Sequence, residues 1–216
     1  MSRGLTPQRL KQSRRTEVRS GTTFHTHGLD LEAAQDYLAT DPGRVYKRQV
    51  LRVWKVAHPG KAPNDKDLEA LNDRALDQLR SFTKPPRTET IKPGDTLVKI
   101  VPVGSGPTKY TPFWTTKADL DAAVASGKNL SEYFALPIKS EAGRYRVYEM
   151  SAKAETQVFV GRVAPSSELG GTVTKEGGAL QVLVPDRGAF NQPVRTMAVH
   201  NAPDLKAKRG YAAAQI

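Results

Sequence analysis

Histidines are the first residues of this chain whose types and spacing suggest chemistry. His25 and His27 are spaced so that both imidazoles would lie on one side of a strand, where they could bind a metal ion. Without further ligands nearby, the end of a loop is the simpler interpretation, and we predict no metal site. His200 follows the last apolar run, where it could act as a general base or be purely structural.

Several common catalytic motifs are absent from the sequence. Gly104-x-Gly106 lacks the third glycine of a dinucleotide-binding motif and precedes no helix directly, so we expect a turn there. The chain has neither a G-x-x-x-x-G-K-[ST] phosphate-binding loop nor a G-x-S-x-G nucleophile elbow. It also has no cysteine, which excludes disulfides, thiolate metal sites and a cysteine nucleophile.

Basic, aromatic and amide residues between positions 94 and 187 carry the remaining chemistry. Lys99 lies in an alternating apolar run, the segment 113–115 is Phe-Trp-Thr, and Gly177-Gly178-x-x-Gln181 opens a β-run. Each also has a structural interpretation. The lysine could occupy the solvent face of a half-buried strand, the two aromatic rings could belong to the core, and the glutamine could be an ordinary outward-facing residue.

The order of these segments resembles that of the C-terminal toxin domains of bacterial polymorphic and contact-dependent systems. More specifically, it resembles the necrotizing-toxin-type NAD glycohydrolases, whose folds are similar to those of ADP-ribosyltransferases. Gly177-Gly178-x-x-Gln181 is the most specific element, although two glycines and a glutamine also suit the start of an ordinary hairpin. The resemblance covers about half of the chain and leaves residues 1–90 unexplained.

The resemblance implies a role for each position. A basic residue on the first strand, here Lys99, would hold a nucleotide phosphate, and the aromatic and hydroxyl groups of segment 113–116 would contact the nicotinamide side. Gln181 would bind the ribose hydroxyl next to an oxocarbenium-like transition state. The catalytic residues implied in this way are Gln181 and Thr115. The substrate-binding residues implied are Lys99, Tyr110, Phe113, Trp114, Arg162, Gly177 and Gly178.

Two departures from the transferase pattern refine this expectation. Transferases to arginine often carry a Glu-x-Glu pair, whereas this chain has Ala179 and Gln181. An amide can hydrogen-bond a ribose hydroxyl but cannot accept a proton as a base, which favours attack by water. The necrotizing-toxin-type enzymes likewise have Gln there. Lys99 also stands where an arginine is usual, so a bidentate grip on phosphate would come from Arg162 or Arg144.

The predicted function is an antibacterial-type toxin that hydrolyses NAD to nicotinamide and ADP-ribose, with NAD as substrate and no bound cofactor. It would be secreted or delivered into the cytoplasm of a target cell and neutralised by an acidic cognate immunity protein. Three alternatives stay open. They are an ADP-ribosyltransferase acting on protein or nucleic acid, a metal-independent ribonuclease using His200, Lys99 and arginines, and a non-enzymatic interaction module. Use of NADP as well as NAD is also open.

The elements that must position these residues follow from the hydrophobic pattern. Apolar residues recur with a helical period over 29–82, with Asp30 as the expected first cap and a break at Asp41-Pro42-Gly43. After residue 90 the period changes to two, with a helical insert near 117–134. This order predicts an α+β fold. With the resemblance, it implies N-terminal helices and then a mixed, mostly antiparallel, ADP-ribosyltransferase-like β core.

The predicted organisation has four parts. Residues 1–28 are expected to be a disordered basic tail, 29–90 a helical region, 91–200 the catalytic domain and 201–216 a polar tail. Within the catalytic domain, residues 165–178 are expected to be a loop rich in Gly, Ser and Thr.

Charge and hydropathy restrict the partners. The formal net charge is +11, and residues 1–20 alone carry six Lys or Arg against one Glu. Much of the excess positive charge lies in the tails and not on a globular face. Nucleic acid is therefore a less favoured partner. The apolar runs are far shorter than the roughly 20 residues of a transmembrane helix, so we expect no membrane insertion. No apolar stretch follows the basic N-terminus, and no signal peptide is expected.

Overall fold

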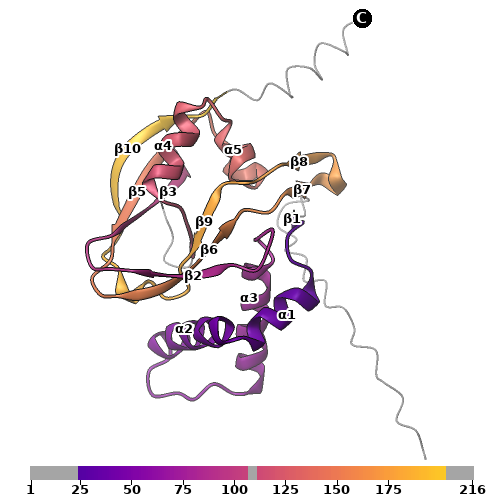
Figure 1. Cartoon of the computed structure of the whole chain (residues 1–216), viewed down its shortest axis with the longest axis vertical. Helices are drawn as coiled ribbons and strands as arrows, with labels where there is room; N and C mark the ends of the chain where they lie inside the picture. The colour runs from indigo at the N-terminus through magenta and orange to yellow at the C-terminus, as the bar shows by residue number, and fades with distance from the viewer. Residues whose placement is uncertain (1–23, 107–110, 203–216) are drawn as a thin grey trace, which may run out of the picture.

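The chain has an α+β fold, which the computed structural model describes for residues 24–106 and 111–202 (Figure 1). As the sequence predicts, three helices precede the main strands and two more helices interrupt them. The helices are α1 (Leu31–Ala39), α2 (Asp41–Ala57), α3 (Asp65–Leu79), α4 (Lys117–Ala125) and α5 (Leu130–Tyr133), with 3₁₀ turns η1 (Ile138–Ser140), η2 (Leu169–Gly171) and η3 (Arg187–Ala189). The strands are β1 (His25–Thr26), β2 (Arg87–Ile91), β3 (Thr96–Pro102), β4 (Phe113–Trp114), β5 (Arg144–Ser151), β6 (Thr156–Arg162), β7 (Ser166–Glu168), β8 (Val173–Lys175), β9 (Leu180–Leu183) and β10 (Val194–His200).

Side-chain caps define where the three N-terminal helices begin. Asp30 accepts a hydrogen bond from the backbone N–H three residues on, at 2.8 Å, as predicted for α1. Thr40 does the same for α2 at 3.2 Å. Asn64 and Asp67 form a reciprocal capping box at the start of α3. The caps satisfy backbone N–H groups that have no acceptor within a helix.

The Asp41-Pro42-Gly43 segment begins α2, whereas the sequence pattern predicted a break in helical structure there. Proline is tolerated in the first turn of a helix because its missing N–H would find no acceptor within the helix anyway. Glycine is required at position 43 because a Cβ there would lie 2.1 Å from the carbonyl oxygen of Tyr37. These residues therefore separate two helices that follow each other directly.

Two sheets meet at one point and form the centre of the molecule. One has the strand order β10-β5-β3 and the other β2-β6-β9-β4. They are joined where Val98 of β3 and Thr115 exchange two backbone hydrogen bonds, both 2.9 Å. The β core was predicted to be mixed and mostly antiparallel, and every strand pairing among the described residues is antiparallel.

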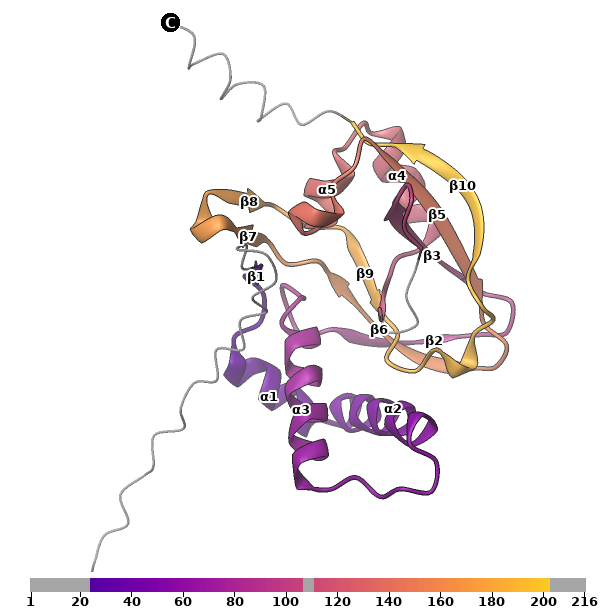
Figure 2. The same cartoon turned by 180° about the vertical axis from the view of Figure 1, so that it is seen from behind.

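A third sheet corrects two details of the sequence prediction. Its strands have the order β1-β7-β8, and β7 and β8 lie within residues 165–178, where a loop was expected. β1 lies within residues 1–28, the predicted tail, and pairs with β7 through His25 opposite Ser167 (Figures 1 and 2). The pairing partner lies about 140 residues away, so local composition does not reveal it.

The helices α1–α3 gather at one end of the molecule and pack on the four-stranded sheet (Figures 1 and 2). Tyr46 of α2 meets the ring of Phe159 edge-on, with ring centroids 4.9 Å apart, and Leu183 belongs to the same buried cluster. Helices α4 and α5 pack through Leu120 and Leu130 against β3 and β5. None of the described helices is both long and apolar enough to cross a membrane.

Candidate active site

A small cavity lies where β3 and β4 separate beyond the Val98–Thr115 bridge. Its volume is about 90 Å³, and we call it the wedge cavity. Five residues predicted from separate segments are among those that line it: Lys99, Phe113, Trp114, Thr115 and Gln181. Its other walls are Val98, Ile100, Phe134, Leu136, Val163 and Leu180. The wedge cavity is therefore mainly apolar, with a few polar groups that converge on it.

The short length of β4 places its residues at this cavity. Phe113 and Trp114 pair with β9, and the strand ends because Thr116 caps α4, accepting from the Asp119 N–H at 3.2 Å. Trp114 is 3% exposed and belongs to the core beneath the sheet. The core interpretation of this ring is therefore correct, and the same ring lines the cavity.

Lys99 occupies the cavity wall with its amine 5.2 Å from the centre of the Trp114 ring. The amine also lies 3.5 Å from the carbonyl oxygen of Thr111. Burial lowers the pKa of Lys99 from 10.5 to about 7, with a smaller contribution from the positive charge of Arg187. A bound anion would restore the charged form, because an opposite charge raises the pKa of an amine.

Arg187 is a residue of this region that the sequence analysis did not single out. Its guanidinium carbon lies 5.5 Å from the centre of the Trp114 ring, and burial lowers its pKa. It belongs to η3, which Asp186 caps by accepting from the Gly188 N–H at 2.8 Å. The sequence showed only a turn that closes a strand, with no sign that this turn folds back onto an aromatic ring.

Two buried polar atoms of the wedge lining have no hydrogen-bond partner among the described residues. They are the indole Nε1 of Trp114 and the hydroxyl Oγ1 of Thr115. Leaving a buried polar group unpaired costs about 1–3 kcal/mol, and such groups in native proteins usually have a water or ligand partner. Trp114 and Thr115 are consecutive residues at the end of β4, so their side chains leave opposite faces of the strand and would contact different parts of a ligand.

Gln181 connects the wedge cavity to the helical layer. Its side chain is buried, and its Nε2 donates to the Ser81 hydroxyl at 2.7 Å. It pairs with Gly161 of β6, where a Cβ would lie 2.6 Å from the ring of Phe82. The prediction that Gln181 is more than an outward-facing strand residue agrees with this burial, while its chemical role stays a prediction.

Other predicted residues lie away from this cavity. Arg162 points to Asp119 at 3.4 Å and to the Gly178 carbonyl at 3.3 Å, and it does not line the wedge. Arg144 is exposed and pairs with His200 in the β5–β10 ladder. The expected arginine fork is therefore formed by neither residue at this position. Tyr110 lies outside the described residues.

Gly177 and Gly178 have backbone reasons to be glycines. Both have positive φ, and a Cβ on Gly177 would lie 2.7 Å from the carbonyl oxygens of Val163 and Ala164. The N–H of Gly177 donates to the Glu132 carbonyl at 3.0 Å. The pair thus attaches the start of β9 to α5, and contact with a ligand stays a prediction.

The histidines take structural positions in the described part of the chain. His27 Nε2 lies 2.7 Å from the Ser167 hydroxyl, next to the β1–β7 pairing. His200 is exposed at the end of β10. The described residues contain no group of three or more His, Cys, Asp or Glu that could hold a metal ion.

Comparison with known proteins gives weak similarities to solved structures. No family model and no curated protein matches the sequence. Rhs1-CT, solved in complex with its cognate immunity protein RhsI1, is 22% identical and aligns over 54% of this chain and 82% of its own, with a TM-score of 0.38. Tse6, solved in complex with Tsi6, is 14% identical over 68% of this chain and 93% of its own, with a TM-score of 0.34. At TM-scores below 0.5 these similarities do not assign a function.

Proposed function

We propose that the wedge cavity is the active site of an NAD glycohydrolase, and that this chain is the toxin domain of an antibacterial effector. The observation that carries the proposal is the convergence of Lys99, Trp114, Thr115 and Gln181 on one cavity. These residues come from three segments that are far apart in the chain, and their roles follow from the resemblance to necrotizing-toxin-type enzymes.

The reaction suits a site without a nucleophilic side chain. The bond between the ribose C1′ and the nicotinamide nitrogen breaks, and its electron pair stays on the nitrogen. A water oxygen forms the new bond to C1′ and releases a proton to solvent. Positive charge develops on the ribose in the transition state, so the site must stabilise that charge. In this proposal Gln181 holds the ribose hydroxyl nearest to it.

The unpaired hydroxyl of Thr115 matches the nicotinamide end of the substrate. A carboxamide offers one carbonyl acceptor and two N–H donors. In this proposal the Thr115 hydroxyl accepts from the amide N–H. This buried hydroxyl would then gain the partner that it lacks in the free protein.

The volume of the cavity limits how much of NAD can enter it. Small-molecule pockets usually measure about 300–1,000 Å³, whereas the wedge cavity measures about 90 Å³. Only the nicotinamide end would enter the cavity, and the pyrophosphate would lie toward Arg187 and Lys99. Binding of the pyrophosphate would recharge the Lys99 amine, so substrate binding near pH 7 would take up a proton.

The direct test is to incubate the purified chain with NAD and follow nicotinamide and free ADP-ribose by chromatography. The unmodified chain is expected to release both in equal amounts. Gln181→Ala should lower turnover at least a hundredfold. Label from NAD that ends on protein instead of free ADP-ribose would identify a transferase, and no release from folded protein would overturn the proposal.

Two control variants separate chemistry from folding. Ser81→Ala removes the hydrogen-bond partner of Gln181 without changing the wedge lining, so it should retain most of the activity. Gln157→Ala removes an exposed glutamine from β6 and should leave turnover unchanged. If Ser81→Ala loses as much activity as Gln181→Ala, the glutamine acts through the fold and not on the substrate.

An immunity partner is part of the same proposal. An enzyme that depletes NAD would kill its producer, and a chain of net charge +11 would associate fastest with an acidic protein. Expression of the chain inside bacteria should stop growth, and Gln181→Ala should restore it. Co-expression of an acidic protein encoded next to it should also restore growth, and failure of every such neighbour would contradict this part of the proposal.

A further inference from the structure

A second and larger cavity borders α5 and the end of β10. Its volume is about 480 Å³, within the usual range for small-molecule sites. It is lined by Asn129, Ser131, Glu132, Glu141, Ala142, Gly143, Asn201 and Ala202. We call it the glutamate cavity. None of its lining residues belongs to the site proposed for NAD.

The amides and the hydroxyl of this cavity are held by hydrogen bonds within the protein. Asn201 accepts from the Leu130 N–H at 2.6 Å and donates to the Ser131 hydroxyl at 3.1 Å. Asn129 donates to the Ala202 carbonyl at 2.8 Å. These bonds fix α5 against the end of β10 and occupy the polar groups that could otherwise bind a neutral ligand.

The hydroxyl of Ser131 is held further by a buried tyrosine. It lies 2.7 Å from the hydroxyl of Tyr145, which also accepts from the Ala142 N–H at 3.0 Å. The Tyr145 hydroxyl donates to the Ser140 carbonyl at 3.1 Å in the same network. The wall of the cavity is therefore built before any ligand arrives, and it holds few free donors.

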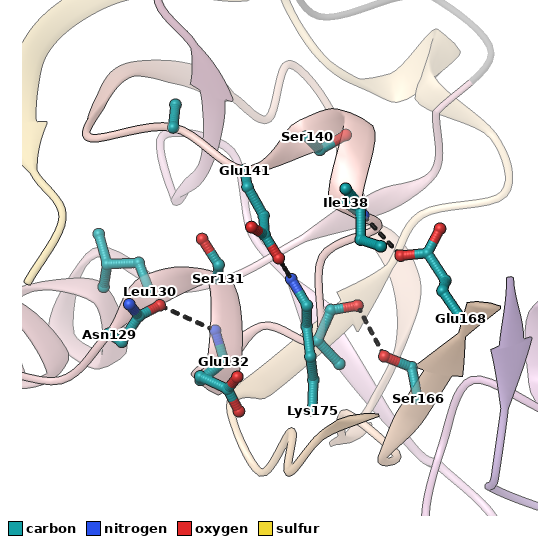
Figure 3. Close-up of polar contacts among 12 residues, drawn as sticks. Asn129, Leu130, Ser131, Glu132, Ile138, Ser140, Glu141, Ser166, Glu168 and Lys175 are labelled. Atoms are coloured by element: carbon teal, nitrogen blue, oxygen red, sulfur yellow. Dashed lines mark hydrogen bonds and ion pairs between the residues drawn. The ribbon is translucent and has the colours of Figure 1, made fainter. Parts of the chain in front are cut away.

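The two glutamates are the groups with unused acceptor capacity. Glu132 Oε2 is buried and has no hydrogen-bond partner among the described residues. Glu141 is 44% exposed and forms an ion pair with Lys175, whose side chain is 3% exposed (Figure 3). Together the three groups carry one net negative charge. A buried carboxylate oxygen without a donor is destabilising, and the N–H donors of a ligand that draws the Glu132 carboxylate toward the cavity would remove that cost.

We propose that the glutamate cavity binds a small organic cation through an ammonium or guanidinium group, with Glu132 as the main acceptor and Glu141 at the rim. Charge-assisted hydrogen bonds to a carboxylate are stronger than neutral ones, and a guanidinium can engage both oxygens of one carboxylate. The proposal does not depend on the function proposed for the wedge cavity, because it uses different residues.

The test measures binding of agmatine, which carries both an ammonium and a guanidinium group, to the full chain by isothermal titration calorimetry at constant ionic strength. Saturable binding is expected, and tetramethylammonium, which has no N–H donor, should bind at least tenfold more weakly. Glu132→Gln should weaken agmatine binding at least tenfold. Glu69→Gln, which removes the same charge from an exposed position on α3, should not change it.

A second variant blocks the cavity without removing charge. Gly143 lines the cavity, and a Cβ built there meets no atom within 4 Å, so Gly143→Leu can fold and fill part of the space. It should weaken agmatine binding while the far-ultraviolet circular dichroism stays unchanged. Absence of saturable binding, or equal binding by wild type, Glu132→Gln and Gly143→Leu, would overturn the proposal.

Two further titrations identify the source of the cation. A capped tripeptide with a central arginine presents the same guanidinium on a protein backbone. Tighter binding of agmatine than of this peptide supports a free small molecule, and the reverse order overturns that part and indicates the side chain of a protein. Magnesium chloride that competes with agmatine at equal ionic strength would overturn the assignment to an organic cation.

Discussion

The wedge cavity and the glutamate cavity share one wall and have opposite character. Residues 129–136 supply Phe134 and Leu136 to the wedge, and Ser131 and Glu132 to the glutamate cavity. The wedge is small and mainly apolar, and its ionisable wall residue is Lys99. The glutamate cavity is several times larger, and its ionisable wall residues are acidic. One short segment thus contributes both to a site suited to anions and to a site suited to cations.

The comparison teaches how each charge is accommodated. In the wedge, where no described residue forms an ion pair with Lys99, burial lowers the pKa of this amine to about 7, so the amine is partly uncharged near neutral pH. Beside the glutamate cavity, the buried amine of Lys175 is paired with Glu141, which lines the cavity. A charge that is penalised in the free protein favours a ligand of opposite sign more strongly than one already paired.

The largest change in stability is expected at Gly177 and Gly178, the glycine pair that attaches the start of β9 to α5. Gly177→Ala should destabilise the fold by about 4 kcal/mol, because the Cβ would strike two carbonyl oxygens and the backbone has positive φ. Gly178→Ala meets no neighbouring atom and should cost only about 1 kcal/mol. Urea denaturation measures both. Equal costs would indicate that the attachment at Gly177 is loose.

The next largest change in stability concerns Lys99, the buried amine of the wedge cavity, and it depends on pH. The unfolded chain holds the Lys99 proton up to pH 10.5, whereas the folded chain releases it near pH 7, so stability rises with pH between these values. Lys99→Met should therefore stabilise the protein at pH 7 by about 3 kcal/mol more than at pH 9.5.

Urea denaturation of wild type and Lys99→Met at both pH values gives this difference. The measurements stay below pH 10 because burial raises the pKa of Tyr37 to about 12. Above pH 10 this tyrosine would ionise in the unfolded chain before it ionises in the fold, which lowers stability. A difference between the variants that is the same at pH 7 and pH 9.5 would show that the amine stays charged in the fold.

Much of the fold and part of the site could be predicted from local patterns. The Asp30 cap of α1 and the strand β3 follow from patterns of neighbouring residues, and the structure confirms both, although β3 is buried on both faces and its burial does not alternate. Lys99, the 113–115 segment and Gln181 were chosen for their chemistry, and they line one cavity. Alternation alone does not predict this, because Trp114 pairs with Val182, and the side chain of Gln181 therefore leaves the opposite face of the sheet from Trp114.

What the sequence did not reveal depends on contacts between distant segments. Arg187 sits in a turn with no periodic pattern, and only the packed structure places it over Trp114. β7 and β8 are rich in small polar residues, so their strand character comes from pairing with each other and with β1. The glutamate cavity combines residues 129–132, 141–143 and 201–202, and no local motif joins these three segments.

A smaller change in stability is expected at the ion pair of Lys175 and Glu141 beside the glutamate cavity. Glu141→Gln leaves Lys175 buried without a counter-ion and should cost about 2 kcal/mol, less than for a fully buried pair because Glu141 is half exposed. Lys175→Met replaces the amine with an apolar group of similar size and should change stability by less than about 1 kcal/mol. Thermal unfolding of the two variants gives the order. A larger loss in Lys175→Met would show that the pair itself stabilises the fold.

The smallest effect compares one hydroxyl from each cavity and predicts opposite signs. Thr115 Oγ1 has no hydrogen-bond partner among the described residues, so the isosteric Thr115→Val should stabilise the free protein by about 1 kcal/mol. Ser131 is hydrogen-bonded to Tyr145 and Asn201, so Ser131→Ala should destabilise it by about 1 kcal/mol.

Turnover of NAD completes this comparison. Thr115→Val should hydrolyse NAD more slowly although it is more stable, because the hydroxyl that it removes is reserved for the substrate. Ser131→Ala should keep its turnover although it is less stable, because that hydroxyl serves only the fold. Urea denaturation and NAD hydrolysis measured on the same preparations give both quantities. A Thr115→Val variant that is destabilised and fully active would place a bound water, not a substrate, on the Thr115 hydroxyl.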